Sequence, residues 1–136
     1  QRGIPVCAHL GLLPQSVHRL GGYRIQGRDE QGAQQLIDDA KTIEQAGADM
    51  LVLECVPAEL AERVTAAVDI PVIGIGASSA CDGQVLVLYD MLGLTPGKRP
   101  RFSHDFLTET GNIPAAISKY VQDVRAGEFP TQAQQY

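Results

Sequence analysis

Three short apolar runs divide the chain, at residues 4–11, 49–56 and 70–78. In each run apolar side chains dominate consecutive positions instead of alternate ones. Parallel strands that are covered on both faces have this pattern, whereas strands with one face in water alternate apolar and polar residues. The three runs therefore predict three parallel strands.

The two segments between these runs have helical periodicity. Residues 33–48 end near Gly47, and glycine suits the position that follows the last helical residue. Residues 58–68 follow Pro57, and proline suits the first turn of a helix. The order strand, helix, strand, helix, strand predicts a parallel β/α fold. The predicted apolar helix faces consist of Leu36, Ile37, Ala40 and Ile43, and of Leu60, Ala61, Val64 and Val68.

The remainder of the chain is less regular. Residues 83–93 alternate as a fourth strand would, but Val85, Leu88 and Leu92 also fit one helix face. Residues 106–130 predict at least one helix, and the polar tail 131–136 is expected to fray. The apolar residues of this last part are Ile117, Tyr120, Val121 and Val124 on one helix side, with Phe106 and Tyr120 expected as core or interface anchors.

Composition narrows the functional class. Of the 136 residues, 44% are apolar and 20% charged, as in a soluble globular domain. The net charge of −5 with no basic block argues against a nucleic-acid partner. No run reaches the roughly 18 apolar residues of a membrane helix. Because the chain begins with Gln1 and not Met, we expect either processing or an internal piece of a longer protein.

The three cysteines, Cys7, Cys55 and Cys81, have no CxxC spacing. Cys7 and Cys55 lie inside apolar runs, which favours small buried thiols in a reducing cytoplasm. A zinc site or a catalytic thiol is the alternative.

Candidate chemistry gathers where the predicted strands end. In parallel β/α folds the carboxyl ends of the strands carry the active site. His9, Glu54 and the small-residue loop 76–78 occupy such ends. Burial would raise the pKa of Glu54 and make it a usable base near neutral pH. Alternatively, Glu54 pairs with Arg63 and only tethers a helix, and His9 is a structural histidine.

Consecutive segments of the chain resemble one enzyme family, ketopantoate hydroxymethyltransferase. The resemblance covers about residues 3–130, in order. The segments that carry it are "GIPVCAHLGLLPQSV", "GGYRIQGR", "ADMLVLECVPAELAERVT", "IPVIGIGAS" with "CDGQVLVLYDMLG", and "FLTETGNIPAAISKYVQDV".

The resemblance implies a (β/α)8 TIM barrel of the phosphoenolpyruvate/pyruvate type. Members of the family are roughly twice as long as this chain, in line with a complete barrel. Residues 1–136 would then be the carboxyl-terminal half of a single barrel domain, with strands five to eight and the terminal helices. Half a barrel leaves open edges and an uncovered inner face. We therefore expect the missing amino-terminal half as a partner.

The same resemblance implies a reaction. The family transfers a hydroxymethyl group from 5,10-methylenetetrahydrofolate to 3-methyl-2-oxobutanoate, giving 2-dehydropantoate (ketopantoate) for pantothenate and coenzyme A biosynthesis. A Mg²⁺ ion chelates the keto acid and acidifies its C3 proton. Glu54, in "VLECVP", matches the general base, and His9, in "AHLGL", matches the substrate-binding histidine.

The family's Mg²⁺ ligands, two aspartates and a glutamate, are expected on the missing half, together with a substrate lysine. No metal ligand is therefore assigned to this chain. Asp82 and Asp90 are carboxylates expected near the site, but they do not match the ligand motif. The chain alone is expected to be inactive, and a non-catalytic half-barrel remnant or interaction module is the alternative function.

The resemblance carries further expectations about ligands and assembly. Arg24 and Arg28, in the glycine-rich connector 21–32, would approach an anionic group such as the glutamate tail of folate, or else are solvated loop arginines. The family is cytoplasmic and decameric, which makes the carboxyl-terminal helix a candidate subunit contact.

Overall fold

The structure is a computed structural model that describes residues 3–19 and 21–136. Its centre is a parallel four-stranded sheet in the order β1-β2-β3-β4. The three predicted strands are confirmed, each shorter than its apolar run. The strands are β1 (Cys7–Gly11), β2 (Met50–Glu54), β3 (Val72–Ile75) and β4 (Gly83–Gln84).

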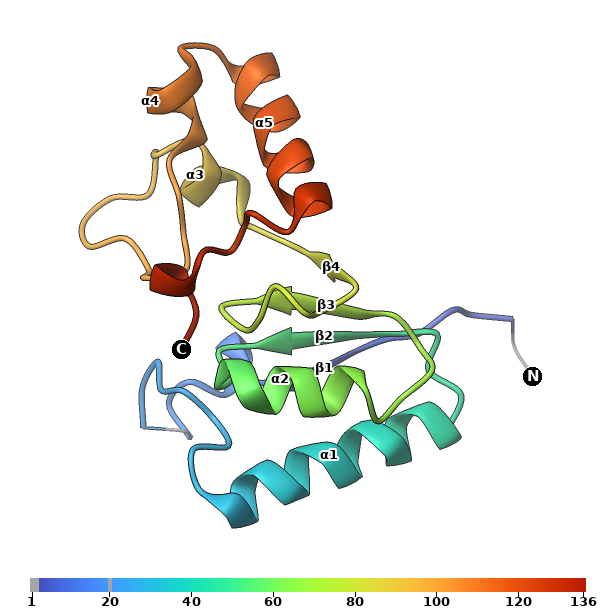
Figure 1. Ribbon diagram of the computed structural model, residues 1–136. Helices are drawn as coiled ribbons and strands as arrows, with labels where there is room; N and C mark the ends of the chain where they lie inside the picture. The colour runs from blue at the N-terminus through green and yellow to red at the C-terminus, as the bar shows by residue number, and fades with distance from the viewer. Residues whose placement is uncertain (1–2, 20) are drawn as a thin grey trace.

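Two helices pack along one face of this sheet, α1 (Glu30–Gln45) and α2 (Ala58–Thr65) (Figure 1). Helix α1 begins three residues earlier than its apolar pattern, because the Asp29 carboxylate accepts a hydrogen bond from the Gly32 N–H at 2.8 Å and caps it. Gly47, with φ +93°, follows the C-cap as predicted. Pro57 is the N-cap of α2 and so lies one position before the predicted first turn.

The two faces of the sheet differ in burial. Side chains alternate along a strand, so Leu51, Leu53 and Val72 point into the core formed with α1 and α2, where each is fully buried. Met50 and Glu54 point to the opposite face, and 37% of Met50 is exposed. No described helix packs against this opposite face in the way that α1 and α2 cover the first.

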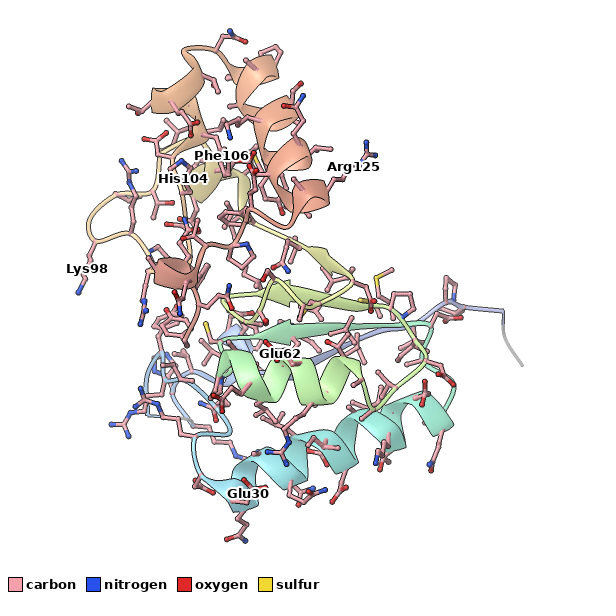
Figure 2. The ribbon with its side chains drawn as sticks, viewed as in Figure 1. Glu30, Glu62, Lys98, His104, Phe106 and Arg125 are labelled. Atoms are coloured by element: carbon pink, nitrogen blue, oxygen red, sulfur yellow. The ribbon has the colours of Figure 1, made fainter. Side chains whose placement is uncertain are left out.

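Segment 83–93 combines both predicted alternatives. A two-residue strand, β4, is followed by the short helix α3 (Leu88–Met91). Beyond β4 the chain forms α4 (Phe106–Thr110) and α5 (Ile113–Ala126), which build a second hydrophobic core apart from the first (Figures 1 and 2). No helix in the described part of the chain is long and apolar enough to cross a bilayer.

Aromatic contacts organise this second core. Phe106 is 1% exposed, and its ring lies 5.6 Å, edge to face, from the rings of Tyr120 and Phe129. Phe106 and Tyr120 are therefore core anchors, as predicted. Two of the four residues predicted for the apolar side of α5, Ile117 and Val121, are exposed, so that half of the prediction is wrong. With Ile113 they form a separate apolar stripe at i, i+4 and i+8 on α5.

The prediction that the tail frays is wrong. The tail forms a single turn of 3-10 helix, η2 (Gln132–Gln134). The Tyr136 carbonyl accepts a hydrogen bond from the Ala58 N–H at 2.7 Å, and the Tyr136 ring meets that of Phe102 edge to face at 6.5 Å. These contacts hold the polar tail against the start of α2, beside the strand ends.

Because the two faces of β2 differ in burial, substitutions on them should lower the free energy of unfolding by different amounts. Leu53→Ala removes a fully buried side chain and should lower the free energy of unfolding by about 2–5 kcal/mol. Met50→Ala, on the same strand but the open face, should cost less than about 1 kcal/mol. Urea unfolding followed by circular dichroism measures both, and similar losses for the two variants would contradict the assignment of faces.

Candidate active site

The site is built on β1 and β2. Glu54 ends β2 as predicted, but His9 is the central residue of β1, so its predicted place at a strand end is wrong. Strand register places Glu54, the last residue of β2, opposite Gly11 of β1 and Ile75 of β3. Glu54 and His9 project from the same open face of the sheet, with His9 Nε2 3.0 Å from Glu54 Oε2. The Glu54 side chain is 12% exposed and that of His9 31%. The structure thus brings together the two residues on which the sequence prediction centred.

The alternative partner for Glu54 is wrong. Arg63 Nη2 lies 3.0 Å from Glu30 Oε1, so this arginine ties α2 to α1 on the opposite side of the sheet. Glu54 faces away from the helices, which leaves it no tethering role there.

His9 and Glu54 are close without being well hydrogen-bonded. The 3.0 Å separation qualifies as an ion-pair contact, yet His9 Nε2 is buried and has no partner of hydrogen-bond geometry among the described residues. A hydrogen bond needs a suitable donor–hydrogen–acceptor angle as well as a short distance, and a misaligned N–H gains little. A buried polar atom left without a partner costs about 1–3 kcal/mol, so His9 Nε2 is poised to bind a ligand oxygen.

Burial sets the chemistry of Glu54. Desolvation raises the pKa of this carboxyl, and the opposing effect of the neighbouring His9 does not cancel the rise. A raised carboxyl pKa makes the ionised form a stronger base near neutral pH. Glu54 can therefore accept a proton from a weak acid held on the open face.

A close backbone approach fixes the position of Glu54. Gly11 has φ +86°, and a Cβ there would lie 2.1 Å from the Glu54 carbonyl oxygen. That oxygen instead accepts a 2.8 Å hydrogen bond from the Leu12 N–H. Only glycine fits this contact, so Gly11 is a positioning residue that the sequence patterns did not single out.

The residue after Glu54 is strained. Cys55, with φ +51°, is the only described non-glycine residue in the left-handed region. Its N–H donates to the Ile75 carbonyl at 2.9 Å, and its carbonyl accepts from the Gln26 N–H at 3.0 Å. Contacts from two other segments therefore hold the turn that ends β2.

The cysteine predictions are confirmed in part. Cys55 and Cys81 are buried, and burial raises the pKa of the Cys55 thiol to about 12, which keeps it uncharged and unreactive. Cys7 is exposed, so its predicted burial is wrong. It lies on edge strand β1, on the open face that no helix covers.

The other predicted site residues lie elsewhere. The Ser78 hydroxyl lies 3.5 Å from a Glu62 oxygen on α2, so this residue of the small-residue loop faces the helices and not Glu54 (Figure 2 labels Glu62). Gly76 of the same loop lies against Phe102, where a Cβ would come within 2.7 Å of the ring. Asp82 accepts a hydrogen bond from the Val72 N–H at 2.8 Å, at the beginning of β3 and therefore at the opposite end of the sheet. Its predicted place near the site is wrong.

The described residues do not form a metal site by themselves. Within residues 3–19 and 21–136, no group of three His, Cys, Asp or Glu side chains is arranged to hold an ion. His9 and Glu54 supply two donors, only one of them oxygen, whereas Mg²⁺ prefers about six oxygen ligands. This part of the chain does not fit a Mg²⁺ site by itself.

A cavity of about 1210 Å³ opens beside the pair, and Leu12 and Cys55, the neighbours of Gly11 and Glu54, line it. Arg24 and Arg28 line it too, and both side chains are exposed. The sequence reading missed "KRPR" at residues 98–101, although it is the densest basic cluster of an acidic chain. The other lining residues are Tyr23, Ile25, Val87, Asp90, Thr95, Lys98, Arg99, Pro100, Arg101, Phe102 and Tyr136.

Comparison with known proteins gives one consistent result. The family model described as ketopantoate hydroxymethyltransferase matches residues 1–132. A 3-methyl-2-oxobutanoate hydroxymethyltransferase of Nitrosococcus oceani is 64% identical over 129 residues, 95% of this chain and 49% of the relative. The enzyme of the same name from Stutzerimonas stutzeri is 64% identical over 130 residues, with the same coverage. The one from Alkalilimnicola ehrlichii is 58% identical over 134 residues, 98% of this chain and 48% of the relative. The chain spans about half the length of these relatives.

The raised pKa of Glu54 predicts a pH-dependent cost in stability. The unfolded chain releases this proton near pH 4.5 and the folded chain only at higher pH, so stability falls as pH rises through that interval. Glu54→Gln removes the penalty and should raise the urea midpoint at pH 7, with the gain shrinking toward pH 4. Glu59→Gln, an exposed carboxylate on α2, is the matched control. A lower midpoint for Glu54→Gln at pH 7 would mean that the His9 pair outweighs desolvation.

Proposed function

The chain belongs to the ketopantoate hydroxymethyltransferase family, and we propose that it forms the carboxyl-terminal half of an enzyme that makes 2-dehydropantoate. The complete enzyme transfers a hydroxymethyl group from 5,10-methylenetetrahydrofolate to 3-methyl-2-oxobutanoate. The observation that carries the proposal is the Glu54–His9 pair, a buried carboxylate beside an imidazole with an unsatisfied nitrogen at the carboxyl end of a parallel sheet.

The proposed architecture is a (β/α)8 barrel of the phosphoenolpyruvate/pyruvate type, with β1 to β4 as its fifth to eighth strands. Three features support it. The strands are parallel and in sequential order, helices cover one face only, and β1 leaves one edge unpaired in the described chain. The amino-terminal half would close the barrel, pair with β1 and bury the open face that carries Met50.

In the proposed reaction Glu54 is the general base. Its carboxylate removes the C3 proton of 3-methyl-2-oxobutanoate, and burial favours the neutral acid that results. The C3 carbon, now nucleophilic, forms a bond to the methylene carbon of the folate. Both bonds from that carbon to folate nitrogens break, so that tetrahydrofolate leaves, and a water molecule supplies the oxygen of the new hydroxymethyl group. His9 Nε2 binds an oxygen of the keto acid and holds C3 against the carboxylate.

Mg²⁺ is proposed as cofactor of the complete enzyme, with its ligands on the amino-terminal half, because the described residues do not form such a site. Bound there, it would polarise the keto group and acidify C3. A cytoplasmic decamer is the proposed assembly, and the exposed stripe of Ile113, Ile117 and Val121 on α5 suits a subunit contact.

Proton exchange tests the base directly. The chain, combined with the amino-terminal half of the Nitrosococcus relative and Mg²⁺ in D₂O, should exchange the C3 proton of 3-methyl-2-oxobutanoate, followed by NMR. Glu54→Gln should slow the exchange by roughly 10²–10⁴-fold, because the base contributes about that factor. Glu59→Gln should leave it unchanged.

The outcomes separate the two functions considered. The chain alone should exchange no faster than Glu54→Gln, and exchange by the chain alone would refute the half-barrel proposal. Absence of exchange even with the added half would favour a non-catalytic half-barrel module.

A further inference from the structure

The polar tail, residues 131–136, contacts both sides of the turn that follows Glu54. The Tyr136 carbonyl accepts a hydrogen bond at 2.7 Å from the N–H of Ala58, three residues beyond Cys55. The Tyr136 ring lies on the other side of the turn, against the end of β3. Figure 1 shows the red tail ending beside the arrowheads of β2 and β3.

An aromatic pair covers the backbone at the end of β3. The rings of Phe102 and Tyr136 meet edge to face, 6.5 Å apart. Gly76, with φ +58°, lies directly against them, because a Cβ there would come within 2.7 Å of the Phe102 ring and 3.2 Å of the Tyr136 ring. Any side chain at this position would therefore displace the pair. We call Phe102 and Tyr136 the aromatic brace.

The aromatic brace is connected to Glu54 through the backbone of the sheet. Ile75 precedes Gly76, and its carbonyl accepts the hydrogen bond from the Cys55 N–H at 2.9 Å. Ile75 is also the register partner of Glu54 in the sheet. A shift of the backbone at Gly76 would therefore move the contacts that hold Glu54.

The turn at Cys55 needs such support. Cys55 has φ +51°, a conformation that costs free energy for a residue with a Cβ and persists only where surrounding contacts impose it. Cys55 and Tyr136 line the same cavity. Burial raises the pKa of the Tyr136 phenol, and the nearby Cys55 thiol adds to the rise. The tail therefore covers the strained turn from outside the sheet.

Further contacts hold the tail in this place. Arg101 Nε donates to the Ala133 carbonyl at 2.8 Å, and the Arg101 guanidinium lies 5.4 Å from the centre of the Tyr136 ring. Within the tail, the Thr131 N–H donates to the Gln134 side chain at 2.8 Å. The aromatic brace is thus a fixed part of the fold, although it belongs to segments that follow the sheet in the chain.

We propose that Phe102 and Tyr136 are positioning residues for Glu54. They hold the end of β3, the end of β3 holds the turn at Cys55, and this turn fixes where the Glu54 carboxylate lies. Neither ring has to touch the substrate. The consequence for catalysis rests on the proposed role of Glu54 as base, whereas the effect on the turn does not.

Alkylation of the 136-residue chain with iodoacetamide, followed by peptide mass spectrometry, measures whether the turn is held. In the wild type Cys7 should react first, because it is exposed whereas Cys55 and Cys81 are buried. Tyr136→Ala should speed the labelling of Cys55 by roughly 10-fold or more, because an unsupported turn opens more often. Cys81, which lies 3.8 Å from the Thr65 hydroxyl on α2, should keep its rate and so reports any general loosening.

Matched variants separate the aromatic brace from a general loss of packing. Tyr136→Phe keeps the ring and should label as the wild type does. Phe102→Ala removes the other ring and should act as Tyr136→Ala does. Tyr136→Leu is the milder truncation, with a smaller rise expected, and serves if Tyr136→Ala does not fold. Tyr89→Ala removes a tyrosine ring that is 63% exposed and should leave the labelling of Cys55 unchanged.

The same Tyr136 variants in the reconstituted enzyme test the consequence for Glu54. The assay combines the chain with the amino-terminal half of the Nitrosococcus relative, Mg²⁺ and saturating 3-methyl-2-oxobutanoate in D₂O. Tyr136→Ala should slow the C3 proton exchange by roughly 10- to 100-fold, because a base displaced by about an ångström loses about that factor. The KM for the keto acid should change less, and Tyr136→Phe should exchange at the wild-type rate.

Two results would overturn the proposal. One is labelling of Cys55 in Tyr136→Ala that is unchanged, or that rises equally with the labelling of Cys81. The other is faster labelling of Cys55 with an unchanged exchange rate, which would show that the aromatic brace does not act on Glu54. A wild type that does not exchange refutes the proposed function instead, and the labelling of Cys55 then decides by itself whether the aromatic brace holds the turn.

Discussion

The contact between the ends of β1 and β2 is the constraint on which the rest of the site depends. Gly11 leaves room for the Glu54 carbonyl, which the Leu12 N–H then binds at 2.8 Å. Cys55 adopts φ +51° immediately afterwards, held through its backbone by Gln26 and Ile75. The backbone on both sides of Glu54 is therefore fixed before any ligand binds. The general base proposed here must be held within fractions of an ångström of its target, and this contact restrains Glu54 in that way.

The two faces of the sheet affect the stability of the fold in opposite directions. The face with Leu51 and Leu53 is dry and packed, so it stabilises the fold through apolar burial. The other face holds Glu54 with its pKa raised by desolvation, a cost that the packed face offsets. His9 beside it lowers this cost only in part, because its Nε2 is not aligned for a good hydrogen bond. The two side chains are thus close but incompletely hydrogen-bonded, which leaves His9 Nε2 able to bind a ligand.

The carboxyl-terminal segment completes the strand ends from outside the sheet. Its aromatic core is separate from the sheet core. The hydrogen bonds that join the parts include one from the Tyr120 hydroxyl to the Gln84 carbonyl at 2.9 Å and one from the Ala58 N–H to the Tyr136 carbonyl at 2.7 Å. Through this docking the loop with Lys98 reaches the cavity that the first connector lines with Arg24. Arg24 and Lys98 consequently line one cavity only in the folded chain, because they are about seventy residues apart in sequence.

The sequence by itself determined the parallel β/α order, the two covering helices, and the placement of Glu54 at a strand end, because apolar periodicity and strand direction are local properties. It could not determine that Arg63 pairs with Glu30, that Cys7 is exposed, or that the polar tail packs, because each depends on which surfaces meet in space. The same holds for the orientation of the His9 imidazole and for the convergence of two basic loops on one cavity. Those features are decided by contacts between residues far apart in the chain, and only the tertiary structure specifies them.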